Sequence, residues 1–415
     1  MTSPSRRHVC RTADPDASTI GVPSWGPEVG ATPARILRVA VVMNVLPHYR
    51  SAFYRCLFQR DDMDVRVFCQ AAIPGVNLKL VHEQFRDRVT VVPVLSMNRD
   101  WLGWQRLPWR TLLSSFDVLF VLGNPRVVSN VVVGILACAA GKGVVVWGQA
   151  HTAGANPLTE ALRLRWWRSF RNVFVYTDGE VRRLKARGFR RQHVAGMNNG
   201  LDQSKIDEAA SAWRPVDLAA WREREGLGRR TLVLSCARME PKNHLELWVE
   251  AMPAVIDRHP ELVWCAIGDG PERTRLEAHV RRLGLTPNVR WVGTVLDEPK
   301  LAPWFLTSQV LVHPAGIGLT LLHAFGYGLP VVTSDDAATH MPEFDAFIPG
   351  ETGLLYRHGD ASSLASAIRQ CLDDEPARQR MGQRGQRIAR EDYNVQVMVE
   401  RFAAIAKRAA EDSRR

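Results

Sequence analysis

The sequence is short of paired cysteines and of long apolar runs, and each shortage excludes a class of protein. Its seven cysteines (10, 56, 69, 138, 236, 265 and 371) are scattered without a C-x-x-C pair. We therefore expect reduced core residues of a cytosolic protein, with no disulfide or metal framework. The most apolar run, 127–140, is too short to cross a bilayer and contains Ser129, Asn130 and Gly134. We expect this run to form a buried helix.

The N-terminal residues 1–34 are polar and rich in proline, and they lack the apolar centre of a secretory signal peptide. We interpret them as a disordered tail. The chain of 415 residues exceeds what one hydrophobic core usually organises, and 46% of its residues are hydrophobic. Its length and composition therefore predict two domains.

Short apolar strands alternate with helical stretches along the chain. The strands expected are 39–44, 65–69, 89–94, 118–122, 144–147 and 173–177 in the first half, and 232–235, 262–267, 289–292, 310–312 and 331–333 in the second. Helices are expected at 362–372, 376–389 and 395–410. This alternation is typical of an α/β protein whose parallel sheets are covered by helices on both faces. The turn-rich stretch 196–202 separates the two sets, so we predict domains at 35–200 and 201–392.

A glycine-rich unit spans residues 309–334, with the sequence Q-V-L-V-H-P-A-G-I-G-L-T-L-L-H-A-F-G-Y-G-L-P-V-V-T-S. An apolar strand passes through Gly316 and Gly318 into a short helix, and a second strand follows, which is a βαβ pattern. The two glycines let the backbone approach a ligand closely. The first amides of the helix lack partners within it, and together with the macrodipole they favour an anion. Gly-rich turns also occur for structural reasons alone, so the unit is a weak signal when taken by itself.

Two cations follow another buried strand, 231–237. Arg238 comes directly after it, and Lys242 follows four residues later. The carboxyl ends of parallel strands are where doubly wound sheets bind ligands. A guanidinium, an ammonium and a helix N-terminus suit a diphosphate better than a single phosphate or carboxylate. The alternative is that both cations belong to a solvated helix start.

These segments together resemble the nucleotide-binding half of the retaining glycosyltransferases of family four, which have the GT-B architecture. The landmarks are C-A-R-M-E-P-K-N-H (236–244), A-I-G-D-G-P-E-R-T-R-L-E (266–277), N-V-R-W-V-G-T-V (288–295) and the glycine-rich unit, in this order. The resemblance extends more weakly from about Arg35 onward. It implies two Rossmann-like domains facing a cleft, with a C-terminal helix at 393–411 that returns to the first domain.

The chain departs from this family at the glycine-rich unit. Family members usually carry Glu-x7-Glu there, the first Glu on the transferred sugar and the second on the ribose. The corresponding residues here are Ala315 and His323. Backbone amides at Gly318, Leu319 and Thr320 do not depend on side chains and would still bind a diphosphate. His323 would hold a ribose hydroxyl through a ring nitrogen, whereas Ala315 cannot replace a carboxylate.

The resemblance also implies the rest of the donor site. Arg238 and Lys242 would stabilise the charge that develops on the leaving nucleoside diphosphate. Peptide groups near Gly293 and Val295 would border the base. Such cation clamps replace a metal ion, so we expect a metal-independent enzyme without a cofactor, for which the nucleotide-sugar is a substrate.

Candidate residues in the first domain follow two of its expected strands. His151 lies in the loop after 144–147, where the family has a histidine that contacts the transferred sugar. Asn44, His48 and Arg50 follow the first strand and are candidates for the acceptor side. Histidines on loops are often only structural or exposed, and that reading remains open for both histidines.

Positive charge is concentrated between residues 160 and 193. Ten Lys or Arg stand there against three acidic residues, a net charge of +7 out of the chain's +11. The segment L-R-L-R-W-W-R-S-F-R (162–171) mixes Arg with aromatic residues, which favours peripheral attachment to an anionic membrane. A nucleic-acid partner is the competing interpretation, but no nucleic-acid motif is present. Trp166, Trp167 and Phe170 would alternatively be the core face of a helix.

The sequence therefore predicts a cytoplasmic enzyme that transfers a sugar from a nucleotide-diphosphate donor to an acceptor hydroxyl, with retention of configuration. We expect a saccharide or lipid-linked acceptor at the inner face of the cell membrane, in polysaccharide or glycolipid biosynthesis. Two alternatives remain. One is a different GT-B enzyme, such as a sugar-nucleotide epimerase or a phosphorylase, and the other is a non-catalytic protein that binds a nucleotide or a partner glycosyltransferase.

Overall fold

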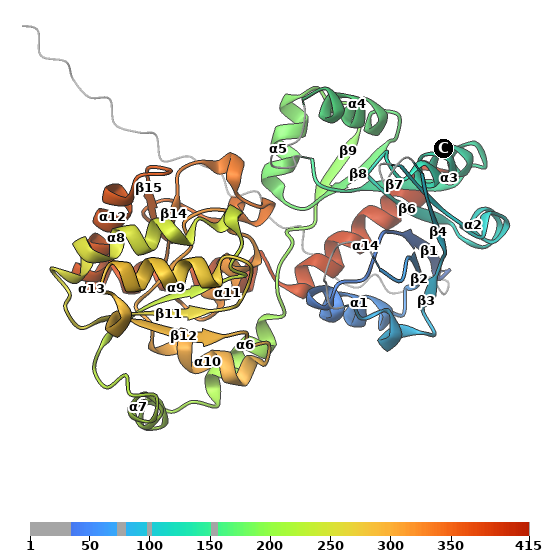
Figure 1. The fold of residues 1–415 in the computed structure, drawn as a ribbon. Helices are drawn as coiled ribbons and strands as arrows, with labels where there is room; N and C mark the ends of the chain where they lie inside the picture. The colour runs from blue at the N-terminus through green and yellow to red at the C-terminus, as the bar shows by residue number, and fades with distance from the viewer. Residues whose placement is uncertain (1–34, 73–79, 98–101, 151–156, 415) are drawn as a thin grey trace, which may run out of the picture. The chain divides into compact units, whose positions relative to one another are not determined.

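Two parallel β-sheets organise the chain (Figure 1). The computed structural model describes residues 35–72, 80–97, 102–150 and 157–414. The first sheet has the strand order β3-β2-β1-β6-β7-β8-β9, and the second has the order β12-β11-β10-β13-β14-β15. All strand pairs recorded in both sheets are parallel, and one short antiparallel pair, β4-β5, stands apart. The predicted α/β class with two parallel sheets is confirmed.

The first sheet is built from residues 37–196. Its strands are β1 (Leu37–Val42), β2 (Met63–Cys69), β3 (Val89–Val91), β6 (Val118–Leu122), β7 (Gly143–Trp147), β8 (Asn172–Val175) and β9 (His193–Gly196). The connecting elements are η1 (His48–Arg50), α1 (Ser51–Phe58), η2 (His82–Phe85), β4 (Val94–Met97), β5 (Leu102–Gln105), α2 (Trp109–Ser115), α3 (Val128–Ala139), α4 (Pro157–Trp167) and α5 (Asp178–Ala186).

The second sheet follows after two helices, α6 (Gln203–Ser211) and α7 (Pro215–Arg224). Its strands are β10 (Thr231–Cys236), β11 (Leu262–Ile267), β12 (Val289–Gly293), β13 (Val310–Val312), β14 (Val331–Ser334) and β15 (Gly353–Tyr356). The connecting elements are η3 (Pro241–Asn243), α8 (Leu245–Ile256), α9 (Arg273–Arg282), η4 (Thr286–Asn288), α10 (Glu298–Thr307), α11 (Leu319–Gly326), η5 (Ala337–Thr339) and η6 (Pro342–Ala346). The chain ends in α12 (Ala361–Asp373), α13 (Glu375–Glu391) and α14 (Val395–Asp412).

Each sheet is buried on both faces, which explains the continuous apolar runs of its strands. Successive side chains of a strand point to opposite faces. In β1, Val39 and Val41 join one hydrophobic cluster, while Ala40 and Val42 join another. In β10, Leu234 and Val233 are likewise divided between two clusters. Helices therefore cover both faces of each sheet, as a doubly wound fold requires.

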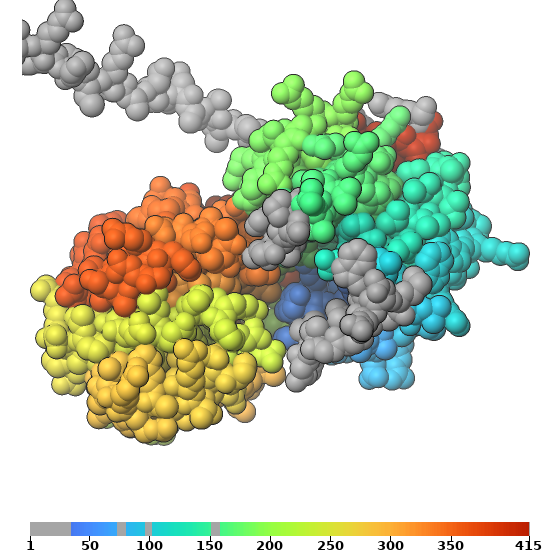
Figure 2. Space-filling view, turned by 45° about the horizontal axis from the view of Figure 1, so that its top comes forward, coloured from blue at the N-terminus to red at the C-terminus, as the bar shows by residue number. Residues whose placement is uncertain are grey.

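The C-terminal helix α14 packs on the first sheet, although the second sheet precedes it in the chain. Phe402 of α14 is fully buried and stacks on Phe120 of β6, with ring centroids 4.2 Å apart. Figure 1 shows α14 beside β6 and β7. In Figure 2 the red C-terminal atoms lie beside the green ones of the first sheet's helices, and Arg171 donates from Nη1 to the carbonyl of Asp412 at 3.3 Å. The boundaries at 200 and 392 stay predictions.

Several helices begin at a side chain that caps them. Asp374 accepts a hydrogen bond from the amide of Ala377, and Asn394 accepts one from Val397. Such caps satisfy amides that the helix itself leaves unpaired. The caps explain why α13 and α14 begin close to the predicted positions.

The structure corrects some predicted elements. The strand expected at 89–94 is interrupted at Pro93, which has no N–H for a ladder, so β3 ends at Val91 and β4 starts at Val94. The helix expected to be buried, α3, buries only one face, and Ile135 and Leu136 are exposed. The elements β9, α6, α7 and β15 were not predicted, because their apolar runs are short.

Candidate functional site

Two loops at the carboxyl edge of the second sheet lie against each other. Strands β10 and β13 are neighbours, so the segments that follow them emerge side by side. The amide of Ala315 donates to the carbonyl of Asn243 at 3.3 Å. The side chain of Asn243 is buried and donates from Nδ2 to the carbonyl of Arg238 at 2.6 Å. The cation loop and the glycine loop therefore form one joined surface.

The two predicted cations share one carboxylate. Arg238 Nη1 lies 3.2 Å from Glu240 Oε1, and Lys242 Nζ lies 2.8 Å from Glu240 Oε2. Their side chains are 58% and 67% exposed, whereas that of Glu240 is 23% exposed. Both cations thus remain accessible to a solute, and Glu240 holds them within reach of the same anion. Sequence reasoning missed Glu240, although it stands between them in the M-E-P-K segment.

The glycine loop needs its glycines. Gly316 has φ of +68°, and a Cβ there would meet Asn243 Oδ1 at 3.0 Å and the carbonyl oxygen of Lys242 at 3.1 Å. Gly318 precedes α11, and its carbonyl accepts from the amide of Leu321 at 2.9 Å. The amides of Gly318, Leu319 and Thr320 therefore precede the first hydrogen bond of the helix and suit an anion.

The residues at the two carboxylate positions of the family behave differently. Ala315 is fully buried, so its side chain offers nothing to a ligand. The side chain of His323 is 14% exposed, and its Nε2 donates to Glu298 Oε1 at 2.7 Å. Thr320 Oγ1 donates to the carbonyl of Cys236 at 3.1 Å, which ties the start of α11 to the end of β10.

Glu298 is a carboxylate that sequence reasoning missed. It begins α10 and accepts a second hydrogen bond, from the hydroxyl of Tyr327, at 2.7 Å. Burial acts to raise the pKa of Glu298, but the hydrogen bond and charge of His323 and the bond from Tyr327 outweigh it, so the pKa lies below its usual value. Glu298 is therefore ionised at neutral pH.

Of the two residues predicted to border the base, Gly293 ends β12 and Val295 lies in the loop between β12 and α10. Gly293 has φ of +82°, and its carbonyl accepts from the amide of Gly268 at 2.8 Å. Val295 is partly buried against the same hydrophobic cluster as Leu319 of α11. The loop that carries Gly293 and Val295 continues directly into Glu298.

The first-domain candidates do not share one environment. His48 is exposed beside Tyr49, whereas Arg50 is only 4% exposed. The Arg50 guanidinium lies 5.3 Å from the ring centroid of Trp147 and 4.9 Å from that of Tyr176, and its Nη1 has no hydrogen-bond partner among the described residues. His151 lies outside the described residues.

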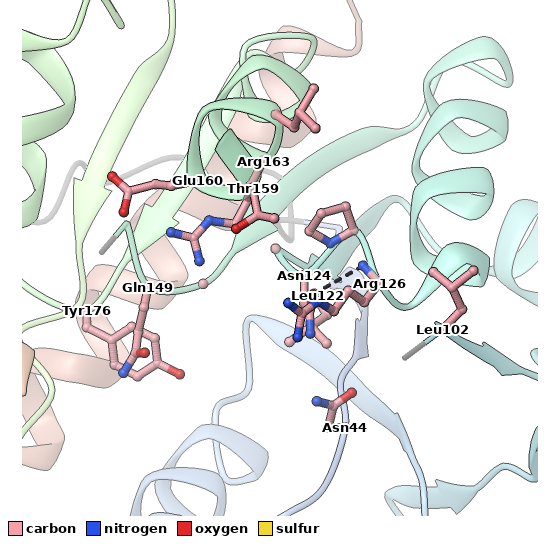
Figure 3. A pocket seen from close by; sticks show the side chains of 14 residues that line it. Asn44, Leu102, Leu122, Asn124, Arg126, Gln149, Thr159, Glu160, Arg163 and Tyr176 are labelled. Carbon is pink, nitrogen blue, oxygen red and sulfur yellow. Dashed lines mark hydrogen bonds between the residues drawn. The ribbon is translucent and has the colours of Figure 1, made fainter. Parts of the chain in front are cut away.

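Asn44 lines a pocket of about 550 Å³ at the carboxyl edge of the first sheet. Figure 3 shows Gln149 and Tyr176 on one side of this pocket, with Arg163 extending from α4. The pocket is wide enough for a sugar unit. Amide, hydroxyl and guanidinium groups line it together with Leu102, Leu122 and Leu162, and more of its surface is apolar than polar. Tyr176 also flanks Arg50, so Asn44 and Arg50 lie near the same pocket.

The basic aromatic segment proves to be mainly core. Trp167 and Phe170 are buried in the hydrophobic cluster that covers the first sheet, and Trp167 Nε1 donates to the carbonyl of Gly123 at 2.9 Å. They do not form a membrane-facing aromatic surface, because α4 packs on the sheet through this face. Two large apolar residues of α4 are exposed, Leu158 at 74% and Leu162 at 66%.

No cluster of three or more His, Cys, Asp or Glu with the arrangement of a metal site occurs within the described ranges. In the same part of the chain, no helix has the length and apolarity needed to span a membrane.

A third missed carboxylate, Glu343, lies beside the glycine loop. It is 5% exposed, accepts a hydrogen bond from Asn199 Nδ2, and its Oε2 lies 3.5 Å from where a Cβ of Gly318 would stand. Burial raises the pKa of Glu343 above its usual value. No periodic pattern marked this residue, because its partners are distant in the sequence.

Parts of the chain are similar in sequence to known proteins. Residues 230–374 match the family model described as Glycosyl transferases group 1. A GDP-mannose-dependent monoacylated alpha-(1-6)-phosphatidylinositol monomannoside mannosyltransferase of Corynebacterium glutamicum is 26% identical over 222 residues, 50% of this chain and 55% of the relative. The lipopolysaccharide core biosynthesis glycosyltransferase LpsE of Rhizobium meliloti is 27% identical over 233 residues, 54% of this chain and 60% of the relative. The chain thus spans little more than half the length of these curated relatives.

Over most of its length, the chain has the same fold as a solved structure. The crystal structure of Anabaena HepE in complex with UDP superposes with a TM-score of 0.67 at 18% identity, and the match covers 90% of this chain and all of HepE. The chain therefore has the GT-B fold, and its residues 230–374 match the model of the Glycosyl transferases group 1 family.

Proposed function

We propose that this protein is a glycosyltransferase that moves a sugar from a nucleotide-diphosphate donor to an acceptor hydroxyl, with retention of configuration. The observation that carries the proposal is the joined surface of Arg238, Lys242 and the amides of Gly318 to Thr320, linked through Asn243. The matched family and the names of the relatives support sugar transfer. Retention rests on the resemblance to family four.

The joined surface has the chemistry that departure of a nucleoside diphosphate needs. Negative charge develops on the leaving diphosphate as the bond to the sugar breaks. A guanidinium, an ammonium and helix N-terminal amides stabilise that charge without a metal ion. Before the donor arrives, Glu240 keeps both cations positioned. The diphosphate would then replace Glu240 as their partner.

The acceptor would bind in the pocket of about 550 Å³ in the first half. Leu162 of α4 lines this pocket and is 66% exposed, and Leu158 is exposed one turn earlier on the same helix. Arg165 of the same helix is exposed as well. We infer a lipid-linked saccharide as acceptor, reached from an anionic membrane surface on which these leucines rest. By their names, the relatives act on a phosphatidylinositol mannoside and in lipopolysaccharide core synthesis.

The test is product formation by the purified protein with nucleotide-sugars and lipid-linked saccharide acceptors. Arg238→Ala should reduce turnover at least hundredfold, because it removes a charge-assisted contact to the leaving group worth about 3 kcal/mol. Arg214→Ala is the matched control, since Arg214 is also exposed in this half but pairs with Asp217 on α7. Undiminished product from Arg238→Ala would show that the cation assignment is wrong.

A non-catalytic, nucleotide-binding role is the second candidate. The observation in its favour is Ala315, which is buried and supplies no carboxylate for the transferred sugar. Nucleotide binding without transfer or hydrolysis of any nucleotide-sugar, across a panel of acceptors, would favour this role. Conversion of the donor sugar without an acceptor would instead indicate an epimerase.

A further inference from the structure

The carboxylate of Glu298 is held by two donors at one oxygen only. His323 Nε2 and the Tyr327 hydroxyl both donate to Oε1, each at 2.7 Å. Oε2 accepts no hydrogen bond within the described residues, and the side chain is 26% exposed. Two donors on one oxygen fix the plane of the carboxylate. The second oxygen is therefore oriented and available to a ligand that carries hydroxyl groups.

The groups that hold Glu298 are themselves rigidly packed. The ring of Phe305, on the same helix as Glu298, stacks on Tyr327 with centroids 5.0 Å apart and lies 4.5 Å from His323. Phe305 and Tyr327 are buried. This stack joins α10 to α11, so Glu298 has a constant position relative to α11. A loosely held surface carboxylate would lack such a frame.

The position of Glu298 relative to the proposed diphosphate site fits a ribose. His323 follows Leu319 by four residues, about one turn or ~6 Å along α11 from the amides that would bind the diphosphate. In a nucleoside diphosphate the ribose is joined to the α-phosphate through a single methylene and ester oxygen. A vicinal diol bound one turn along the helix thus comes next to the carboxylate that His323 holds.

We propose that Glu298 Oε2 binds the 2′ and 3′ hydroxyls of the donor ribose, and that His323 and Tyr327 are positioning residues for this carboxylate. The proposal rests on the proposed function, because it places the donor on α11. It moves the contact from His323 itself to Glu298. The negative charge that α11 lacks would then come from α10, which lies outside the glycine-rich unit. A carboxylate accepts several hydrogen bonds from hydroxyl groups, whereas an imidazole nitrogen accepts one.

The test compares nucleotides that differ only in the ribose hydroxyls. UDP and GDP, each with its 2′-deoxy and 3′-deoxy form, are titrated calorimetrically into the wild type, Glu298→Gln and His323→Gln. In the wild type at least one deoxy form should bind about tenfold or more weakly than the ribonucleotide, as expected for a hydrogen bond to a charged group. In Glu298→Gln the ribonucleotide should lose that factor, and the difference between ribo and deoxy forms should nearly vanish.

A structural role would give a different pattern. Weakening of ribo and deoxy forms by the same factor in Glu298→Gln would overturn the inference, because the hydroxyls would then not interact with this carboxylate. His323→Gln should show a partial loss of the discrimination, since Tyr327 still holds Oε1. Glu277→Gln is the matched control, because Glu277 is 30% exposed and paired with Arg273 on α9, and it should leave all affinities unchanged.

The same titrations separate this inference from the proposed function. Binding of a nucleotide by the wild type, with discrimination that persists in Glu298→Gln, overturns only the role of Glu298. Binding of neither UDP nor GDP by the wild type overturns the nucleotide site on α11 and the present inference with it. Thermal unfolding of each variant without nucleotide identifies any variant that fails to fold, and His323→Gln then provides the comparison.

Discussion

At the scale of single residues, the charged and polar side chains of the second half are arranged by their partners more than by their own types. Glu240 holds Arg238 and Lys242, Asn243 joins their loop to the glycine loop, and Glu298 accepts from His323. Each of these side chains acts on function together with its partner. The effect of a substitution at one member of a pair should therefore be compared with the effect of a substitution at the other.

The buried imidazole of His313 makes stability depend on pH. His313 is 3% exposed, and burial together with the charge of His340 lowers its pKa to about 4. The unfolded chain would take up a proton near pH 6.5, whereas the folded protein resists it until about pH 4. Stability is therefore fully present above pH 6.5 and falls as the pH decreases toward 4.

We expect His313→Gln to flatten this dependence. The wild type should lose about 2–3 kcal/mol of unfolding free energy through this one group between pH 7 and pH 4. Urea unfolding at pH 7, 5.5 and 4.5 measures the loss, and the difference in slope between variant and wild type isolates His313 from the carboxylates. Equal slopes would mean that His313 titrates alike in the folded and unfolded chain.

At the scale of elements, the glycine loop and helix α4 each allow a direct test. Gly316→Ala should reduce both stability and nucleotide affinity, because a Cβ at φ of +68° would also meet Asn243 and the carbonyl of Lys242. Gly350→Ala is the control, since its φ is +77° but nothing lies within 4 Å of a Cβ. The backbone strain alone costs about 1–2 kcal/mol. In urea unfolding, Gly316→Ala should lose more unfolding free energy than this strain accounts for. Equal losses in the two variants would contradict the contact with Asn243 and Lys242.

The exposed leucines of α4 should matter for membranes and not for folding. Replacing Leu158 and Leu162 together with Ser should weaken binding to phosphatidylglycerol vesicles about tenfold or more, because partial burial of two leucines contributes roughly 1.5 kcal/mol or more. Ile135→Ser on α3 is the control, since Ile135 is 56% exposed and lies outside the basic segment. Vesicle co-sedimentation measures the effect. An unchanged affinity would remove α4 from the membrane proposal.

At the scale of the whole molecule, α14 connects the end of the chain to the first sheet. Phe402→Ala should cost about 3–5 kcal/mol of unfolding free energy, because it leaves a cavity among Phe120, Trp147 and Phe174. Lys407→Ala on the same helix is the control. Its ion pair with Asp62 is half-exposed, so the variant should lose less than about 1 kcal/mol. Similar losses in urea unfolding would show that α14 contributes little to the first core.

The sequence by itself determined the two parallel sheets, since runs such as 231–236 and 262–267 are apolar throughout and only sheets buried on both faces require that. It also located the glycine loop and the two cations, because glycines mark a turn with positive φ and the two cations directly follow an apolar run. Only the tertiary structure decided that Glu298 reaches His323, that Trp167 belongs to the core and that Arg50 lies between two rings. The physical reason is that these contacts join elements distant in the chain. Packing determines which face of a helix contacts which neighbour, and a local sequence pattern does not contain that information.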